Sequence, residues 1–115
     1  MDKKVVLVTG SSIGLGRAII EKFASNNYNV IINYNNSKQE AEELKSYIEN
    51  TYHTKAITIK CDITKESEIE EMKQIVLGKE IVKKLQPQNK SIVYFIWAPF
   101  EILLEALQLS LLLLP

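Results

Sequence analysis

The chain has 115 residues, of which 46% are hydrophobic and 24% are charged, and this size and balance predict one compact soluble domain. Fourteen basic and fourteen acidic residues give a net charge of zero, which argues against binding to nucleic acid or to an anionic membrane surface. The single cysteine, Cys61, excludes an internal disulfide, and the first residues lack the pattern of a secretory signal, so we expect a cytoplasmic protein.

The first predicted strand and the first predicted helix differ in the spacing of their apolar residues. Residues 4–9 are mostly β-branched or apolar, which predicts a strand buried on both faces. Over residues 14–25 apolar side chains recur every three or four positions, which predicts an amphipathic helix that ends at Asn26 and Asn27. The predicted buried side of this helix consists of Leu15, Ala18, Ile19 and Phe23.

The alternation of strand and helix occurs twice more. Residues 29–33 and 56–61 are short apolar runs and are predicted strands. Each of these strands is followed by a segment in which apolar residues recur at helical spacing. Three strands that alternate with three helices predict an α/β fold, with a parallel sheet between helices on both of its faces.

The two later helices carry recognisable start signals. Ser37 is the predicted N-cap of a helix that runs through Tyr47, and Glu40, three residues on, completes a capping box. Thr64 is the predicted N-cap of the last helix of this region. The predicted buried side chains of the two helices are Ala41, Leu44, Ile48, Ile69, Met72 and Val76.

A glycine-rich stretch, TGSSIGLG at residues 9–16, lies between the first strand and the first helix. Unpaired amides and the positive end of a helix dipole favour an anionic phosphate at such a place. Gly10 allows a sharp turn off the strand, Gly14 allows close approach of a ligand, and Gly16 allows the helix to pack closely. Ser11 and Ser12 add hydroxyl donors. The spacing alone leaves an ordinary strand-to-helix turn as the alternative.

TGSSIGLG resembles the T-G-x-x-x-G-x-G fingerprint of the short-chain dehydrogenase/reductase family, whose members are Rossmann-fold oxidoreductases that use NAD or NADP. Two further matches follow in family order, NY at residues 33–34 and CDIT at residues 61–64. The resemblance covers residues 3–77 and is strongest to the 3-oxoacyl-acyl-carrier-protein reductase and glucose dehydrogenase branches. It implies an incomplete Rossmann-like sheet with Asp62 at the adenine ring. The implied dinucleotide-binding residues are Thr9, Gly10, Ser11, Ser12, Ile13, Gly14, Gly16, Asn33, Asn35, Ser37, Asp62 and Ile63.

The choice between the two nicotinamide cofactors depends on charge after the second strand. An acid at that point commonly binds the ribose 2′-hydroxyl of NAD and repels the 2′-phosphate of NADP. Here residues 33–37 contain no acid, and Lys38 follows them, so the sequence favours NADP. The resembled family's NADP users often carry a basic residue before the middle glycine, where this chain has Ile13. Arg17, one turn into the first helix, either helps to bind NADP or is a solvated helix residue.

Catalysis in the resembled family requires a serine and a Y-x-x-x-K pair. Tyr34 and Lys38 have that spacing, but they lie after the second strand, at the adenosine end of the cofactor, so we predict no catalytic residue. The family's N-N-A-G motif is absent, and no metal-ligand cluster is present. The sequence thus predicts a truncated or rearranged family member that binds NADP(H) but does not by itself transfer hydride. The alternatives are a non-catalytic interaction module and a gene fragment without function.

We divide the chain into three regions. Residues 1–77 form the predicted dinucleotide-binding half, residues 78–98 resemble a later family helix and the fifth strand, and residues 99–115 form an apolar, leucine-rich tail. The tail either covers an open sheet edge, joins this chain to a second copy or another partner, or is out-of-frame sequence. Glu101 and Glu105 disfavour a membrane span, since an acid at mid-bilayer costs about 2.5 to 3.5 kcal/mol.

Overall fold

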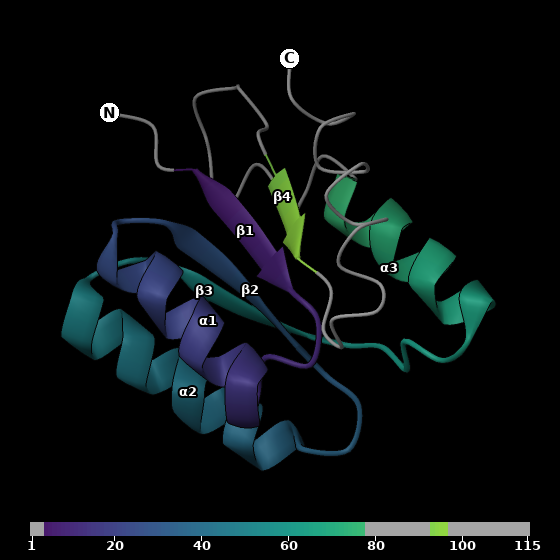
Figure 1. Ribbon diagram of the computed structural model, residues 1–115, viewed down its shortest axis with the longest axis horizontal. Coiled ribbons are helices and arrows are strands. Elements are labelled where there is room, and N and C mark those ends of the chain that lie inside the picture. The colour runs from purple at the N-terminus through teal and green to yellow at the C-terminus, as the bar shows by residue number, and fades with distance from the viewer. Residues whose placement is uncertain (1–3, 78–92, 97–115) are drawn as a thin grey trace.

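The computed structural model describes residues 4–77 and 93–96 of the chain. Its four described strands form one parallel sheet, with α1 and α2 on one face and α3 on the other (Figure 1). The predicted Rossmann-like α/β fold, a parallel sheet with helices on both faces, is therefore confirmed. The elements in chain order are β1 (Val5–Val8), α1 (Gly14–Ser25), β2 (Asn29–Tyr34), α2 (Lys38–Tyr52), β3 (Ala56–Lys60), α3 (Glu66–Leu77) and β4 (Val93–Ile96).

The strands lie in the order β3-β2-β1-β4. Successive strands are added on one side of β1 up to β3, and the next strand, β4, is added on the other side of β1. β1 pairs with β2 on one side, where Val5 lies opposite Asn29, and with β4 on the other side, where Val5 lies opposite Val93. β4 lies in the segment that was predicted to correspond to the fifth strand of the resembled family. In the sheet it occupies the place of the fourth strand in the Rossmann order. Because all pairings are parallel, the carboxyl ends of the strands lie along one edge of the sheet.

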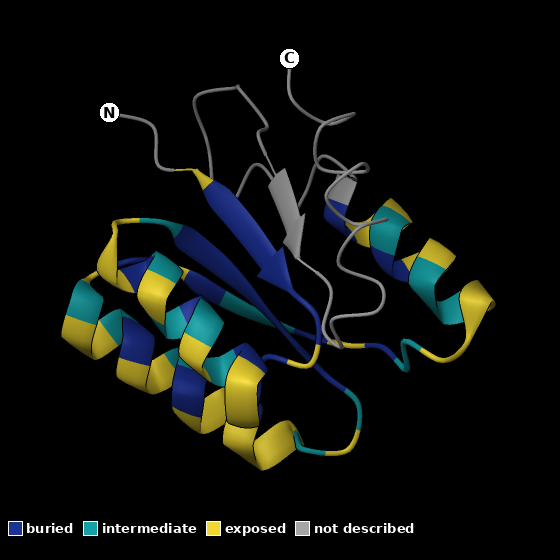
Figure 2. Cartoon of the chain, viewed as in Figure 1, coloured by how far each residue is buried: buried dark blue, intermediate teal, exposed yellow. Residues whose placement is uncertain are grey.

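The sheet is buried between two apolar cores. Every residue of β1 and β2 is buried, as expected for central strands of a parallel sheet (Figure 2). Successive side chains point to opposite faces. Val6, Val8, Val30 and Ile32 pack with the buried residues of α1 and α2, including Ile20 and Leu44. On the other face are Val5, Leu7, Ile31, Ile59, Cys61, Met72 and Val76.

Helix α1 has the predicted bounds and the predicted left-handed stop, with Asn27 at φ 69°. Its predicted buried side is only partly confirmed, because Ile19 and Phe23 are half-buried against the core while Leu15 and Ala18 are exposed. Leu15 is 74% exposed, and the buried residues are Gly16, Ile20 and Ala24. The reason is a close contact at the start of the helix. A Cβ on Gly16 would lie 2.2 Å from the carbonyl oxygen of Gly10, so the Gly16 side of the helix must face inward, and residues four and eight positions later follow it.

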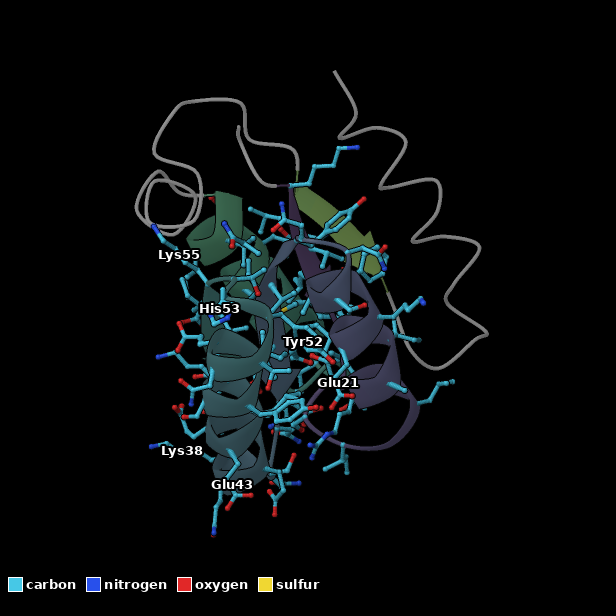
Figure 3. All side chains as sticks on the ribbon, turned by 90° about the vertical axis from the view of Figure 1, so that its left-hand side faces the viewer. Glu21, Lys38, Glu43, Tyr52, His53 and Lys55 are labelled. Carbon is cyan, nitrogen blue, oxygen red and sulfur yellow. The ribbon has the colours of Figure 1, made fainter. Side chains whose placement is uncertain are left out.

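Helix α2 is longer than predicted and ends at Tyr52, where His53 takes the left-handed cap conformation at φ 57°. The predicted buried side chains Ala41, Leu44 and Ile48 are confirmed. Figure 3 shows Lys38 at one end of this helix and His53 at the other. Tyr52 extends toward Glu21 of α1, and its pKa is raised above the ordinary value, mainly by a hydrogen bond with Tyr47.

Of the two predicted helix caps, Ser37 is confirmed in position only, and Thr64 is wrong. Ser37 is at the N-cap position of α2, but its side chain makes no capping hydrogen bond because its hydroxyl contacts that of Ser12. Helix α3 begins at Glu66, two residues after Thr64, whose hydroxyl donates to Asp62 at 2.6 Å. The predicted buried face of α3 is confirmed for Met72 and Val76, while Ile69 is half-buried against the same core.

The predictions for the C-terminal part fall largely outside the described residues. The predicted helix in residues 78–98 and the apolar tail at residues 99–115 lie outside them. Within the described part of the chain, no helix is both long enough and apolar enough to cross a lipid bilayer.

Candidate functional site

The loop from β1 to α1 lies at the carboxyl edge of the sheet, beside the reversal of strand order. Gly10 and Gly14 both have φ of +61°, a conformation that side chains other than glycine rarely adopt. A Cβ at either position would have no heavy atom of the described residues within 4 Å. No described residue therefore fills the space over either glycine, whereas Thr9, Ser11 and Ser12 of the same loop are buried.

The N-terminus of α1 has neither a side-chain cap nor an acidic residue in its first turn. By contrast, α2 has Glu40 in its first turn, and α3 has Glu66 and Glu68. The first amides of a helix lack partners within the helix, and the helix dipole makes this end positive. The start of α1 can therefore accept an anion without competition from its own carboxylates. The exposed side chains of Ile13 and Leu15 add apolar surface beside it.

Asn33 lies directly under the loop and is only 2% exposed. Its side-chain oxygen Oδ1 accepts a hydrogen bond from the amide of Gly10 at 2.9 Å. Its amide nitrogen Nδ2 donates toward the carbonyl oxygens of Ile59 and Cys61, each at 3.3 Å. This side chain thus connects the ends of β1, β2 and β3.

The segment after β2 contributes the other predicted residues of this strand end. Asn35 is half-buried and Asn36 is exposed. The hydroxyl of Ser37, also half-buried, contacts that of Ser12 and joins this segment to the glycine loop. Lys38 begins α2 next to them and is exposed (Figure 3). The predicted residues after β1 and β2 are therefore directly connected in the folded chain.

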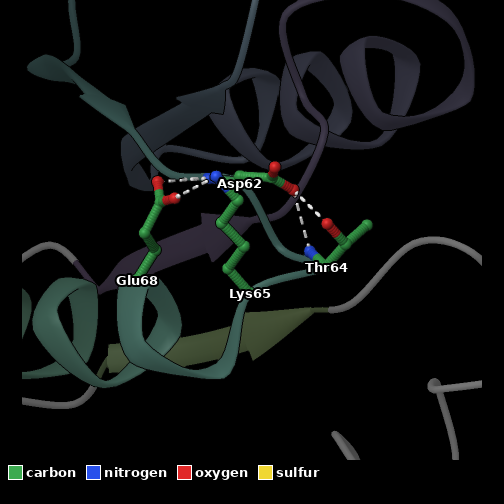
Figure 4. Close-up of polar contacts among 4 residues, drawn as sticks. All are labelled: Asp62, Thr64, Lys65 and Glu68. Atoms are coloured by element: carbon green, nitrogen blue, oxygen red, sulfur yellow. Dashed lines mark hydrogen bonds and ion pairs between the residues drawn. The ribbon is translucent and has the colours of Figure 1, made fainter.

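Asp62 follows β3 and closes a tight polar turn (Figure 4). Its oxygen Oδ1 accepts from the amide of Thr64 at 3.0 Å and from the Thr64 hydroxyl at 2.6 Å. These bonds stabilise the charged carboxylate and hold the pKa of Asp62 below its ordinary value. The Asp62 amide donates to Glu68 at 3.1 Å, and Lys65 pairs with Glu68 at 3.6 Å.

The residues on either side of Asp62 pack against the protein interior. Ile63 is half-buried against the core on the α3 face. Cys61 is 1% exposed, and burial raises the pKa of its thiol above the ordinary value, which disfavours the reactive thiolate form.

The hydrogen bond from the Thr64 hydroxyl to Asp62 gives a prediction for the pH at which the Asp62 carboxyl titrates. We expect Thr64→Val to move the pKa of Asp62 up toward its ordinary value, because the largest cause of the lowering is removed. A carboxyl with a lowered pKa stabilises the fold above its unfolded-state pKa, and that contribution disappears as the pH falls through the folded-state pKa. NMR titration of the Asp62 carboxyl carbon measures the midpoint in both proteins. Thr51→Val on exposed α2 surface is the control, and an unchanged midpoint in the Thr64 variant contradicts the assignment.

The structure brings the predicted site residues together along one sheet edge, after β1, after β2 and after β3. Glu68, which holds the Asp62 amide, is a contact that the sequence analysis missed. The sequence feature that could have indicated this contact is an acid in the first turn of α3, six residues after Asp62. Among residues 4–77 and 93–96, no group of three histidine, cysteine, aspartate or glutamate side chains could hold a metal ion.

The model of the short chain dehydrogenase family matches residues 4–86. The chain belongs to the short-chain dehydrogenase family. It is 38% identical over 74 residues to the hydroxynaphthalene reductase-like protein Arp2 of Metarhizium guizhouense (strain ARSEF 977), covering 64% of this chain and 27% of that protein. It is 37% identical over 67 residues to glucose 1-dehydrogenase 2 of Bacillus subtilis (strain 168), covering 58% of this chain and 26% of that protein. The chain thus matches about a quarter of the length of these curated relatives.

A solved structure shows the same fold. The alcohol dehydrogenase of the archaeon Thermococcus sibiricus, complexed with 5-hydroxy-NADP, superimposes with a TM-score of 0.63 at 24% sequence identity. The match covers 69% of this chain and 33% of the archaeal chain. It agrees with the Rossmann-like arrangement of the four described strands.

Proposed function

We propose that this chain binds NADP(H), with the pyrophosphate on the β1–α1 loop and the N-terminus of α1. The observation that carries the proposal is the position of this loop. It lies at the carboxyl edge of a parallel sheet, where the strand order reverses between β1 and β4, and ligands of open α/β sheets bind at such a switch point. The open space over Gly10 and Gly14 and the acid-free first turn of α1 fit an anionic ligand.

The adenosine end of the dinucleotide is proposed to lie across the ends of β2 and β3. Asp62 is held ionised and half-exposed there and is proposed to accept from the adenine amino group, with Ile63 beside the ring. Asn35, Ser37 and Lys38 are proposed to face the 2′-phosphate of NADP. The support is chemical, since this segment holds neutral donors and a cation but no acid before Glu40. A solved structure of the same fold carries an NADP derivative.

The proposed unit of binding is residues 1–77, and hydride transfer is proposed to require more than this chain. A bound nicotinamide cofactor supplies or accepts the hydride in the parent family. The chain's own residues would hold the phosphates and the adenosine. The only Y-x-x-x-K spacing in the sequence is Tyr34 to Lys38, and Tyr34 is largely buried in the core under α1 and α2.

Titration of NADPH into the purified full chain tests the proposal, with cofactor fluorescence and calorimetry as readouts. We expect saturable binding in the micromolar to submillimolar range, competition by NADP⁺, and no oxidation of NADPH in the presence of simple ketones. A folded chain that shows no saturation at millimolar NADPH contradicts the binding proposal. Turnover by the pure chain contradicts the claim on hydride transfer.

The cofactor preference gives a separate prediction. We expect Asn35→Asp to weaken NADPH binding about tenfold or more, a change of about 1.4 kcal/mol, because the new carboxylate repels the 2′-phosphate. NADH affinity should stay the same or improve. Asn50→Asp, the same change near the far end of α2, is the matched control and should leave both affinities unchanged. Equal losses for NADPH and NADH in the Asn35 variant place the 2′-phosphate elsewhere.

A further inference from the structure

We propose that Asn33 is a positioning residue that holds the glycine loop in its ligand-binding shape and thereby sets the dinucleotide affinity. This inference rests on the proposed function of the loop. Asn33 is the next-to-last residue of β2, and its side chain is buried. It differs from the predicted direct role in cofactor binding, because the contacts of its side chain in the structure are made to the protein.

Asn33 contacts two consecutive residues of the loop through three hydrogen bonds. Its Oδ1 accepts from the amide of Gly10 at 2.9 Å, and its backbone carbonyl accepts from the amide of Ser11 at 3.0 Å. Its own backbone amide donates to the hydroxyl of Ser11 at 2.9 Å. Two of the three bonds involve the backbone of Asn33 and do not depend on the identity of its side chain. The bond to Gly10 does.

The other end of the side chain determines which way the amide group points. Nδ2 lies 3.3 Å from the carbonyl oxygens of Ile59 and Cys61 and 3.4 Å from that of Tyr34. Three carbonyl oxygens around one position require a donor there, so the nitrogen occupies it and Oδ1 is left to face Gly10. Aspartate would place an oxygen against these carbonyls, and alanine or serine would not span the distance.

Gly10 is the residue of the loop whose position has the widest effect. Its φ of +61° is one of several conformations open to glycine, and its carbonyl oxygen would lie 2.2 Å from a Cβ on Gly16. Gly10 therefore sets both the shape of the loop and the approach of α1. Without the Asn33 acceptor, Gly10 regains conformational freedom, and a ligand must order the loop when it binds. Affinity then falls although no group that contacts the ligand has been removed.

A comparison of two buried asparagines on one strand tests this role. Asn29, at the amino end of β2, is 3% exposed, and its Oδ1 accepts from the amide of Lys55 at 2.8 Å. Asn29→Ala thus removes a similar side-chain-to-backbone bond far from the carboxyl edge of the sheet. We expect both alanine variants to melt at lower temperature than wild type. Only Asn33→Ala should raise the Kd of NADPH, by tenfold or more, and Asn33→Asp should behave like it. A wild-type Kd in a folded Asn33 variant, or an equal loss in Asn29→Ala, overturns the proposal.

Amide hydrogen exchange in the wild-type chain keeps the proposal testable if the Asn33 variants do not fold. The Gly10 amide should exchange at least tenfold more slowly than an unstructured glycine amide, because Oδ1 of Asn33 accepts from it in a partly buried setting. Unprotected exchange at Gly10 overturns the proposal. If the wild type protects Gly10 but does not bind NADPH, the proposed function fails, and the hold of Asn33 on the loop is supported independently.

Discussion

Gly16→Ala is expected to destabilise the chain by about 3 kcal/mol or more and to abolish measurable NADPH binding. The new Cβ would lie 2.2 Å from the carbonyl oxygen of Gly10 and 2.8 Å from its carbonyl carbon. Both are backbone atoms, so no flexible side chain can move aside. Overpacking in a well-packed interior costs about 1 to 3 kcal/mol, and a backbone clash belongs at or above the top of that range. Urea unfolding followed by circular dichroism measures the change.

The loss of binding in this variant has the same origin as the loss of stability. To relieve the contact, either α1 must move away from the sheet or the Gly10 turn must open. The first change separates the helix N-terminus from the proposed phosphate position, and the second breaks the bond between Gly10 and Asn33. Since total stabilities of small domains are about 5 to 15 kcal/mol, the variant is expected to remain partly foldable. Binding can then be assayed on folded protein at low temperature, where we expect no saturation by NADPH.

Gly14→Ala is the matched control, since it is the same substitution in the same loop. Gly14 has φ of +61°, so a side chain there is strained by about 1 to 2 kcal/mol, but a Cβ would meet no described atom within 4 Å. We therefore expect the Gly14 variant to lose less stability than the Gly16 variant. Equal destabilisation by the two substitutions means that backbone strain and not the contact with Gly10 dominates, which contradicts the explanation given for Gly16.

The sequence predicted the fold well because hydrophobic period is a local property. The strand of residues 4–9 and the helix of residues 14–25 were found from spacing alone, and their bounds in the structure differ by a residue or less. The glycine loop was also found from the sequence, because its position between a strand and a helix follows from the order of these elements along the chain. Asp62 was found by resemblance, and the structure shows why its carboxylate stays charged.

The missed features depend on contacts between segments that lie far apart in the sequence. Ser37 has the residue type of a helix cap, but its hydroxyl contacts that of Ser12, 25 positions away. Thr64 is the exception, because its competing partner Asp62 is only two positions away. Asn33, at the end of the second predicted strand, was implied by the family resemblance to bind the cofactor. Its contacts with Gly10, 23 positions away, and with the carbonyl of Cys61, 28 positions away, become visible only when β1, β2 and β3 are side by side.

The rotation of α1 is the largest error of this kind, and it leads to the second strong prediction. The sequence put Leu15 inside, whereas the structure leaves it 74% exposed and buries Ile20 completely. Ile20→Ala is therefore expected to cost about 2 to 5 kcal/mol, through lost burial and the cavity left against the strands. Leu15→Ala on the same helix should change the free energy of unfolding by about 0.5 kcal/mol or less.

Urea unfolding of both variants without ligand distinguishes a helix that faces the sheet through Ile20 from one that faces it through Leu15. A large loss at Leu15 with a small loss at Ile20 would mean that α1 faces the sheet through its Leu15 side. Gly16 could not then lie against Gly10, and the close packing of the loop on which the proposed phosphate site depends would be wrong as well.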